Sequence, residues 1–256
     1  MDSLGHLCRS NGFWGKDGAY FRVQGDGVLS CVYQKESTFI DPESSEYSSK
    51  KRTGKYIMVG LWSLYAELPE DLFDGKIVFG WLSPMCFIGD RGIQFYGPQH
   101  ELKLMREEVI PQLDDIMTQT QLVDTCVKLT KIKHRGFLPP QLDLCAAFLK
   151  CNREAEALER VESAFTYSWI RCIGDQCDVI NAEESITVPV SSRERKRTQK
   201  LYRLWAMIAG EQRDTIHRYL EENYNKNLAK IEAIMGRFST SQSRKKATQN
   251  QAQRNR

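Results

Sequence analysis

The sequence predicts an α+β protein: an antiparallel sheet packed by helices, followed by an all-α helical extension with a long C-terminal helix. Two observations carry this prediction. In the first hundred residues, apolar side chains alternate with polar ones between turn signals, which is typical of strands. From His100 onward they recur at steps of three and four, which is typical of helices. With 256 residues, 41% of them hydrophobic and 27% charged, the chain is long and apolar enough to form a core.

The central element is the stretch over residues 55–68, KYIMVGLWSLYAEL. It is apolar on both alternating sides: Tyr56, Met58 and Trp62 on one, and Ile57, Val59 and Leu61 on the other. A strand of this kind is normally covered on both faces, so we expect it in the middle of the sheet. Gly60 interrupts the run and predicts a bulge or a close approach of another group.

Shorter elements surround this strand. We expect a helix over residues 2–10, strands over 20–24, 28–34 and 76–82, and a hairpin over 85–96. Asp26-Gly27 between two alternating runs is a strong hairpin signal. Residues 37–55 are polar and without periodicity, so we expect a long loop that is either functional or mobile.

The second half is predicted to be helical. The expected helices cover residues 100–116, 120–133, 142–149, 155–169 and 192–235. Pro111 should kink or split the first of them near Ile110, because proline lacks a backbone donor. Cys151-Asn152 is the expected turn of a helical hairpin. In the last helix the apolar stripe includes Leu204, Trp205 and Ile208, and Gly210 or residues 221–227 are candidate breaks.

Four regions follow from this pattern. They are a sheet domain with an N-terminal helix over residues 1–98, a helical region with an αα-hairpin over 99–173, a loop and long helix over 174–236, and a disordered basic tail over 237–256. Residues 236–256 hold six cations and no acid, whereas the whole chain has a net charge of +3, so the other residues together carry −3. We expect the tail to be disordered because it has few apolar residues.

The composition also suggests a compartment. No apolar run is long enough to cross a membrane, and the first residues lack the pattern of a signal peptide. The eight cysteines form no C-x-x-C pair, so we expect reduced thiols in a cytoplasmic protein. Cys172 and Cys177, with Asp175 and Asp178, are the nearest approach to a metal site, but they lack a second ligand pair. We therefore expect no metal and no cofactor.

Several short motifs in the N-terminal half carry a family resemblance. They are SNGF (10–13) with YFR (20–22), GDGVL (25–29) running into YQK (33–35), VGL (59–61) with SLY (63–65), and IPQLD (110–114). Over about residues 1–130 the chain resembles a family of bacterial domains of uncharacterised function. The resemblance implies an antiparallel sheet packed by helices in a cytoplasmic bacterial protein, and it supplies no catalytic residues.

The sharpest electrostatic feature is a cluster of cations at the expected start of the last helix. This candidate patch for an anionic partner comprises Arg193, Arg195, Lys196, Arg197, Lys200 and Arg203. Cations at a helix N-terminus oppose the helix dipole, so solvent, an acidic group or nucleic-acid phosphate should compensate them. The acidic group could be internal, on the acidic face of the first helix after the sheet: Glu101, Glu107, Glu108, Asp114 and Asp115. If that face is solvated instead, the cations point outward, toward solvent or an anionic partner.

No catalytic motif is visible. The four histidines lack metal-binding spacing, and Gly25-Asp26-Gly27 is too short for a phosphate loop. We therefore expect a non-catalytic interaction protein with a protein partner. The alternative is a nucleic-acid-associated protein that uses the basic helix start and the basic tail, and an enzyme with an unrecognised site ranks third. The sequence leaves the identity of the partner and the oligomeric state open.

Overall fold

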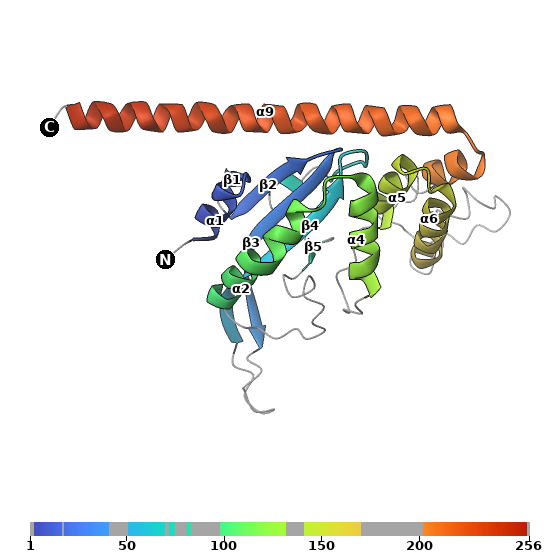
Figure 1. The fold of residues 1–256 in the computed structure, drawn as a ribbon, viewed down its shortest axis with the longest axis horizontal. Coiled ribbons are helices and arrows are strands. Elements are labelled where there is room, and N and C mark those ends of the chain that lie inside the picture. The colour runs from blue at the N-terminus through green and yellow to red at the C-terminus, as the bar shows by residue number, and fades with distance from the viewer. Residues whose placement is uncertain are drawn as a thin grey trace, which may run out of the picture.

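The fold is α+β, with helices packed against an antiparallel sheet, as the sequence predicts (Figure 1). The structure is a computed structural model that describes residues 3–16, 18–40, 51–69, 72–74, 81–82, 98–131, 141–169 and 202–254. In these ranges no helix is long and apolar enough to cross a membrane.

Five strands form the sheet, in chain order, and all neighbours are antiparallel. They are β1 (Trp14–Lys16), β2 (Ala19–Gln24), β3 (Val28–Ile40), β4 (Lys51–Ser63) and β5 (Trp81–Leu82). The β2–β3 hairpin is confirmed. Strand β1, of only three residues, was not predicted. The expected strand over 76–82 is described only at β5, and the expected hairpin over 85–96 lies outside the described residues.

The long loop expected over residues 37–55 is shorter than predicted. Strands β3 and β4 pair without interruption from Val28 opposite Ser63 to Ile40 opposite Lys51. Pairing continues because backbone hydrogen bonds do not require alternating side chains, and this stretch also contains residues that favour strands, such as Phe39 and Ile40. Only residues 41–50 of the expected loop remain outside the described strands.

Strand β4 lies inside the sheet and has buried side chains on both faces, which confirms its predicted central place. Ile57, Val59 and Leu61 belong to a first core cluster, and Met58 and Trp62 belong to a second one. The close approach predicted at Gly60 is made by the indole of Trp62, since a Cβ on Gly60 would lie 1.9 Å from the Trp62 ring. The pairing with β3 continues through Gly60, so no bulge is needed there.

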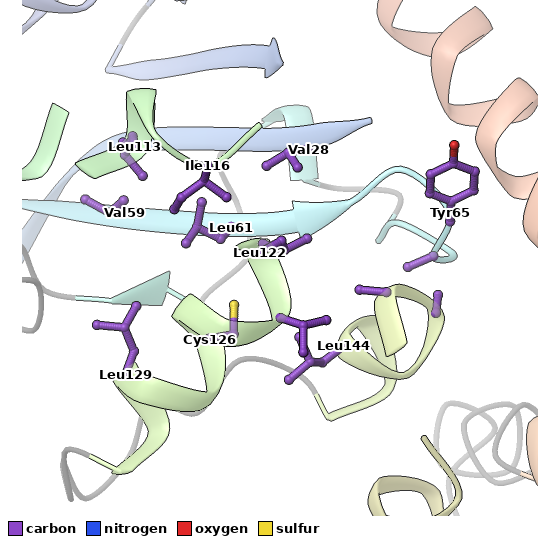
Figure 2. Close-up of a cluster of buried hydrophobic side chains, with 14 of the residues drawn as sticks. Val28, Val59, Leu61, Tyr65, Leu113, Ile116, Leu122, Cys126, Leu129 and Leu144 are labelled. Atoms are coloured by element: carbon purple, nitrogen blue, oxygen red, sulfur yellow. The ribbon is translucent and has the colours of Figure 1, made fainter. Parts of the chain in front are cut away.

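Helices cover the first face of the sheet. They are α1 (Leu4–Ser10), α2 (Pro98–Leu104), a π-helical turn (Met105–Val109), α3 (Ile110–Asp114), α4 (Gln119–Lys131) and α5 (Gln141–Lys150). Helix α6 (Glu154–Trp169) packs on α5. Figure 2 shows Val59 and Leu61 of β4 facing Ile116, Leu122 and Cys126 from the α3–α4 region. The π-helical turn directly precedes Ile110 and Pro111, so the break predicted at the proline is confirmed.

The predicted helical hairpin is formed by α5 and α6. Its turn lies at Cys151 and Asn152, and Asn152 adopts the left-handed conformation with φ of 56°. The cysteines of the described ranges form no disulfide, and Cys126 and Cys145 are buried in the first core cluster.

The last predicted helix is divided in two. A helical segment over residues 202–209 ends at the turn around Gly210, and α9 (Arg213–Arg254) follows. Gly210 is therefore the break, whereas residues 221–227 lie inside α9. Helix α9 also continues through the tail to Arg254, where the sequence predicted disorder. Residues 237–254 contain no proline or glycine and many strong helix formers. With few apolar residues they cannot form a hydrophobic core, but their helix propensity is high, so a helix can still form.

A short 3-10 helix and α9 cover part of the second face of the sheet. The 3-10 helix η1 (Leu72–Asp74) contributes Leu72, and α9 contributes Ile231. Both residues pack in the second core cluster with Phe21, Leu29, Cys31, Met58, Trp62 and Leu64. Rings from Trp14 and Phe73 surround Phe21, each with its centroid 5.1 Å from the Phe21 centroid.

Candidate functional site

Helix α9 is fastened to the body where β4 ends and the β2–β3 hairpin turns. The ring of Tyr224 on α9 stacks on the ring of Tyr65, with centroids 4.9 Å apart and planes 22° apart. Gly27 makes room for this pair, because a Cβ there would lie 2.9 Å from the Tyr224 ring. Lys150 of α5 places its Nζ 4.2 Å from the Tyr65 centroid and 3.7 Å from the Glu221 carboxylate. The junction thus joins the sheet, α5 and α9.

The polar groups of this junction are held by neighbouring residues. The Tyr65 hydroxyl donates to Asp26 Oδ1 at 2.8 Å. Burial, and next the Asp26 carboxylate, raise the pKa of Tyr65, so its phenol stays protonated and acts as a donor. The Asp26 backbone is bound in turn, since its N–H donates to the Met117 carbonyl and its carbonyl accepts from the Gln119 amide. We therefore interpret this cluster as an attachment point of α9.

Beyond the junction, α9 leaves the body. In Figure 1 its last part extends past β1 and α1 to the C-terminal end. We call residues 237–254 the distal helix; at 1.5 Å per residue they span roughly 27 Å. The distal helix carries five cations and no acid: Arg237, Arg244, Lys245, Lys246 and Arg254. The formal charge of the distal helix is therefore +5.

The predicted patch for an anionic partner is described at one residue. Arg203 is exposed on the helical segment 202–209 and makes no ion pair within the described part of the chain. The other members lie outside the described residues: Arg193, Arg195, Lys196, Arg197 and Lys200. Cys172 and Cys177, the nearest approach to a metal site in the sequence, also lie outside the described residues.

Three of the five acidic residues after the sheet have partners of their own. Asp114 pairs with Arg22 of β2 at 2.6 Å, and Glu107 lies 3.9 Å from Lys103. Glu101 departs from the expected solvated face, because its carboxylate accepts the Ile57 N–H of β4 at 3.0 Å. Burial raises the pKa of Glu101 to about 7. No sequence pattern indicates this, since the contact depends on how α2 packs against β4.

One aromatic residue was missed as a surface group. The sequence placed Trp205 on the apolar stripe of its helix, but its side chain is 36% exposed. Leu204 and Ile208, four residues apart, occupy the buried face, so Trp205 lies further round the helix. Tyr202 precedes it by about one turn, with ring centroids 6.1 Å apart. The (i, i+4) spacing of Leu204 and Ile208 is the signal that identifies which face is buried.

Neither a metal-binding cluster among the described residues nor a match to a known protein indicates a function for this chain. Among the described residues, no group of three His, Cys, Asp or Glu side chains could hold a metal ion. No protein-family model matches the chain, and neither a curated protein nor a solved structure matches it. The resemblance to bacterial domains of uncharacterised function therefore stays a prediction.

Proposed function

We propose that this protein is a non-catalytic nucleic-acid-associated protein whose α+β body carries the distal helix to the phosphate groups of DNA or RNA. The observation that supports the proposal is the concentration of five cations, without an acid, on the part of α9 that extends past the body (Figure 1). Each cation that neutralises a phosphate releases a counterion, which favours binding without any need for base recognition.

The composition of the distal helix fits nucleic acid better than a protein partner. The centres of protein interfaces depend on aromatic and other apolar anchors and are depleted in Lys and Ser. The distal helix has one large apolar residue, Phe238, and its uncharged polar residues are Ser, Thr, Gln and Asn. These are the residue types that join Arg and Lys in contacts to phosphate and sugar. The protein partner expected first from the sequence is thus the weaker interpretation.

The attachment of α9 also suits this function. Tyr224 and Ile231 pack against the body at separate points along the helix, which fixes its direction before it leaves. A helix with its side chains is about 10–12 Å across, and the major groove of B-DNA is about 12 Å wide. A helix held at one end can therefore lie along a groove while the body stays outside it.

The test is the salt dependence of binding. Fluorescence anisotropy with a labelled duplex of about 20 base pairs, roughly two turns of DNA, should give an affinity that falls steeply with salt concentration. Changing Arg244, Lys245 and Lys246 together to Gln should weaken binding at low salt and make the slope of log K against log [salt] shallower by about 2–3, near 0.9 for each lost phosphate contact. Changing the neighbouring Ser241, Gln242 and Ser243 together to Ala, which keeps the charge, should leave the slope unchanged.

Two results would contradict the proposal. One is a wild-type protein that binds no nucleic acid at low salt. The other is a slope that is the same in the wild type and in the Arg244, Lys245 and Lys246 variant. Either result would leave a protein partner as the better interpretation.

A further inference from the structure

The distal helix continues α9 without a break, so its residues keep the helical register of the part that packs on the body (Figure 1). Leu220, Asn227 and Ile231 are buried and define the body-facing side of α9. At about 3.6 residues per turn, each residue is rotated by about 100° from the one before it. The position of every residue of the distal helix around the axis can therefore be counted from Ile231.

Six positions of the distal helix form a stripe on the side opposite to Ile231. They follow one another at steps of three and four, which keeps them on one face of a helix. Counted from Ile231, each lies at least about 120° around the axis, and their mean direction is about 180°. We call them the far-side stripe: Arg237, Thr240, Arg244, Ala247, Gln251 and Arg254. The stripe thus runs the whole length of the distal helix.

The far-side stripe differs in composition from the body-facing side. It holds all three arginines of residues 237–254, whereas Lys245 and Lys246 fall within about 60° of Ile231. Phe238, the one large apolar residue of the distal helix, also falls on the body-facing side, about 20° from Ile231. Arginine is therefore separated from lysine and from the apolar residue around one helix.

The residue types of the far-side stripe are those that contact base edges in the major groove of DNA. Arg donates two hydrogen bonds to guanine, Gln pairs with adenine, and Thr and Ala contact the methyl group of thymine. Uncharged polar residues that suit phosphate and sugar flank the stripe: Ser241 and Thr248 on one side, and Ser239 and Asn250 on the other. A protein partner would need large apolar anchors, and the stripe holds no apolar residue larger than alanine.

We propose that the distal helix enters the major groove of duplex DNA with the far-side stripe toward the base edges. This inference rests on the proposed function and names the form of nucleic acid. The major groove of B-DNA admits an α-helix, whereas that of an RNA duplex is deep and narrow and cannot be read by side chains. An RNA duplex can therefore meet the distal helix only from outside the groove.

The first measurement compares a labelled DNA duplex of about 20 base pairs with an RNA duplex of the same sequence, at the same salt concentration. Entry into the groove brings the phosphates of both strands to the helix. The DNA duplex should therefore bind at least about tenfold more tightly than the RNA duplex. A thymidine oligomer of the same length has no groove and should also bind more weakly than the DNA duplex.

Two alanines provide a matched test of which face enters the groove. Ala247 lies in the far-side stripe, and Ala252 lies about 60° from Ile231, on the body-facing side. Changing either of them to Glu adds the same charge to the same helix, and Glu is a good helix former. Ala247→Glu should weaken DNA binding at least about fivefold more than Ala252→Glu, because its carboxylate would lie between the two phosphate strands.

The outcomes separate this inference from the function on which it rests. Groove entry would be overturned by equal affinity for the DNA and RNA duplexes, by equal losses in the two Glu variants, or by a thymidine oligomer that binds as tightly as the DNA duplex. Salt-dependent binding through Arg244, Lys245 and Lys246 would then still stand. A wild-type protein that binds none of the three probes at low salt would overturn both. If circular dichroism shows that Ala247→Glu alone loses helix, the comparison of DNA with RNA in the wild type decides.

Discussion

The side-chain amide of Asn227 on α9 donates to the carbonyl oxygen of Leu64, at the end of β4, at 2.8 Å. The same Nδ2 donates to the Ala66 carbonyl at 2.7 Å, and Asn227 is buried. These carbonyls follow the last paired residue of the strand, where the sheet offers no further donor. One side chain from more than 160 residues away thus satisfies backbone groups that would otherwise be buried without a partner.

Replacing Asn227 by Ala should destabilise the protein by about 1–3 kcal/mol, because two buried carbonyls lose their donor. Chemical denaturation followed by circular dichroism measures this change. Asn225→Ala is the matched control: the same residue type two positions away on α9 is exposed. It should be neutral or slightly stabilising, since Ala is the better helix former. Equal losses in the two variants would show that Asn227 does not hold α9.

Trp62→Ala should cost roughly 3–5 kcal/mol, the range for truncating a large buried aromatic residue. Trp62 is 1% exposed, fills the second core cluster and covers Gly60, so its removal leaves a cavity between β4 and α9. Trp205→Ala, at the exposed tryptophan, should cost less than about 1 kcal/mol. Urea denaturation of both variants makes the comparison, and a nearly neutral Trp62→Ala would contradict the central place of β4.

Glu101 should make the protein less stable as pH rises. Its pKa in the folded state, about 7, is above the ordinary value of 4.5, so the folded protein holds this proton more tightly than the unfolded chain. Its contribution to stability is fully present below about pH 4.5 and is lost as the pH rises to 7. Glu101→Gln keeps an acceptor for the Ile57 N–H but has no proton to lose. The stability of the variant relative to the wild type should therefore increase as the pH rises from about 5 to about 8.

The control for this titration is Glu108→Gln, on the adjoining π-helical turn, where the side chain is exposed. Its stability should follow the wild-type pH dependence, because this variant keeps Glu101 and its buried carboxyl. Denaturation midpoints of the three proteins at about pH 5 and about pH 8 give the comparison. A Glu101→Gln variant that follows the wild-type curve would show that the carboxyl of Glu101 is not desolvated by α2 and β4.

The parts of the fold that repeat along the chain could be predicted from the sequence. Alternation assigned Ile57, Val59 and Leu61 to one face of β4 and Met58 and Trp62 to the other, because successive residues of a strand point to opposite faces. Pro111 predicted the break between α2 and α3, because a proline has no backbone N–H and its effect on a helix depends only on its position in the sequence.

The parts that depend on distant neighbours could not be predicted in this way. Glu101 is like the other acids in its helix and differs only in facing β4. Trp205 has the spacing of a core residue and is exposed because Leu204 and Ile208 occupy the buried face. The attachment of α9 depends on Tyr65, Tyr224 and single polar contacts, which leave no period in the sequence.

Removing residues 237–256 should leave the melting temperature unchanged within about 1–2 °C. Among the α9 residues whose burial is described, which end at residue 236, the last buried one is Ile231. Residues 237–256 contain few apolar side chains that could offset the entropy of ordering them. The far-UV circular dichroism signal should decrease in proportion to the helical residues removed, while the cooperative unfolding transition stays at the same temperature.

Truncation after Glu222 is the matched comparison. It also removes Tyr224, Asn227 and Ile231, so it should lower the melting temperature by many degrees. A drop of several degrees in the shorter truncation would mean that the distal helix packs on the body, and the cations of α9 would then be held by the protein itself instead of being directed to a nucleic acid.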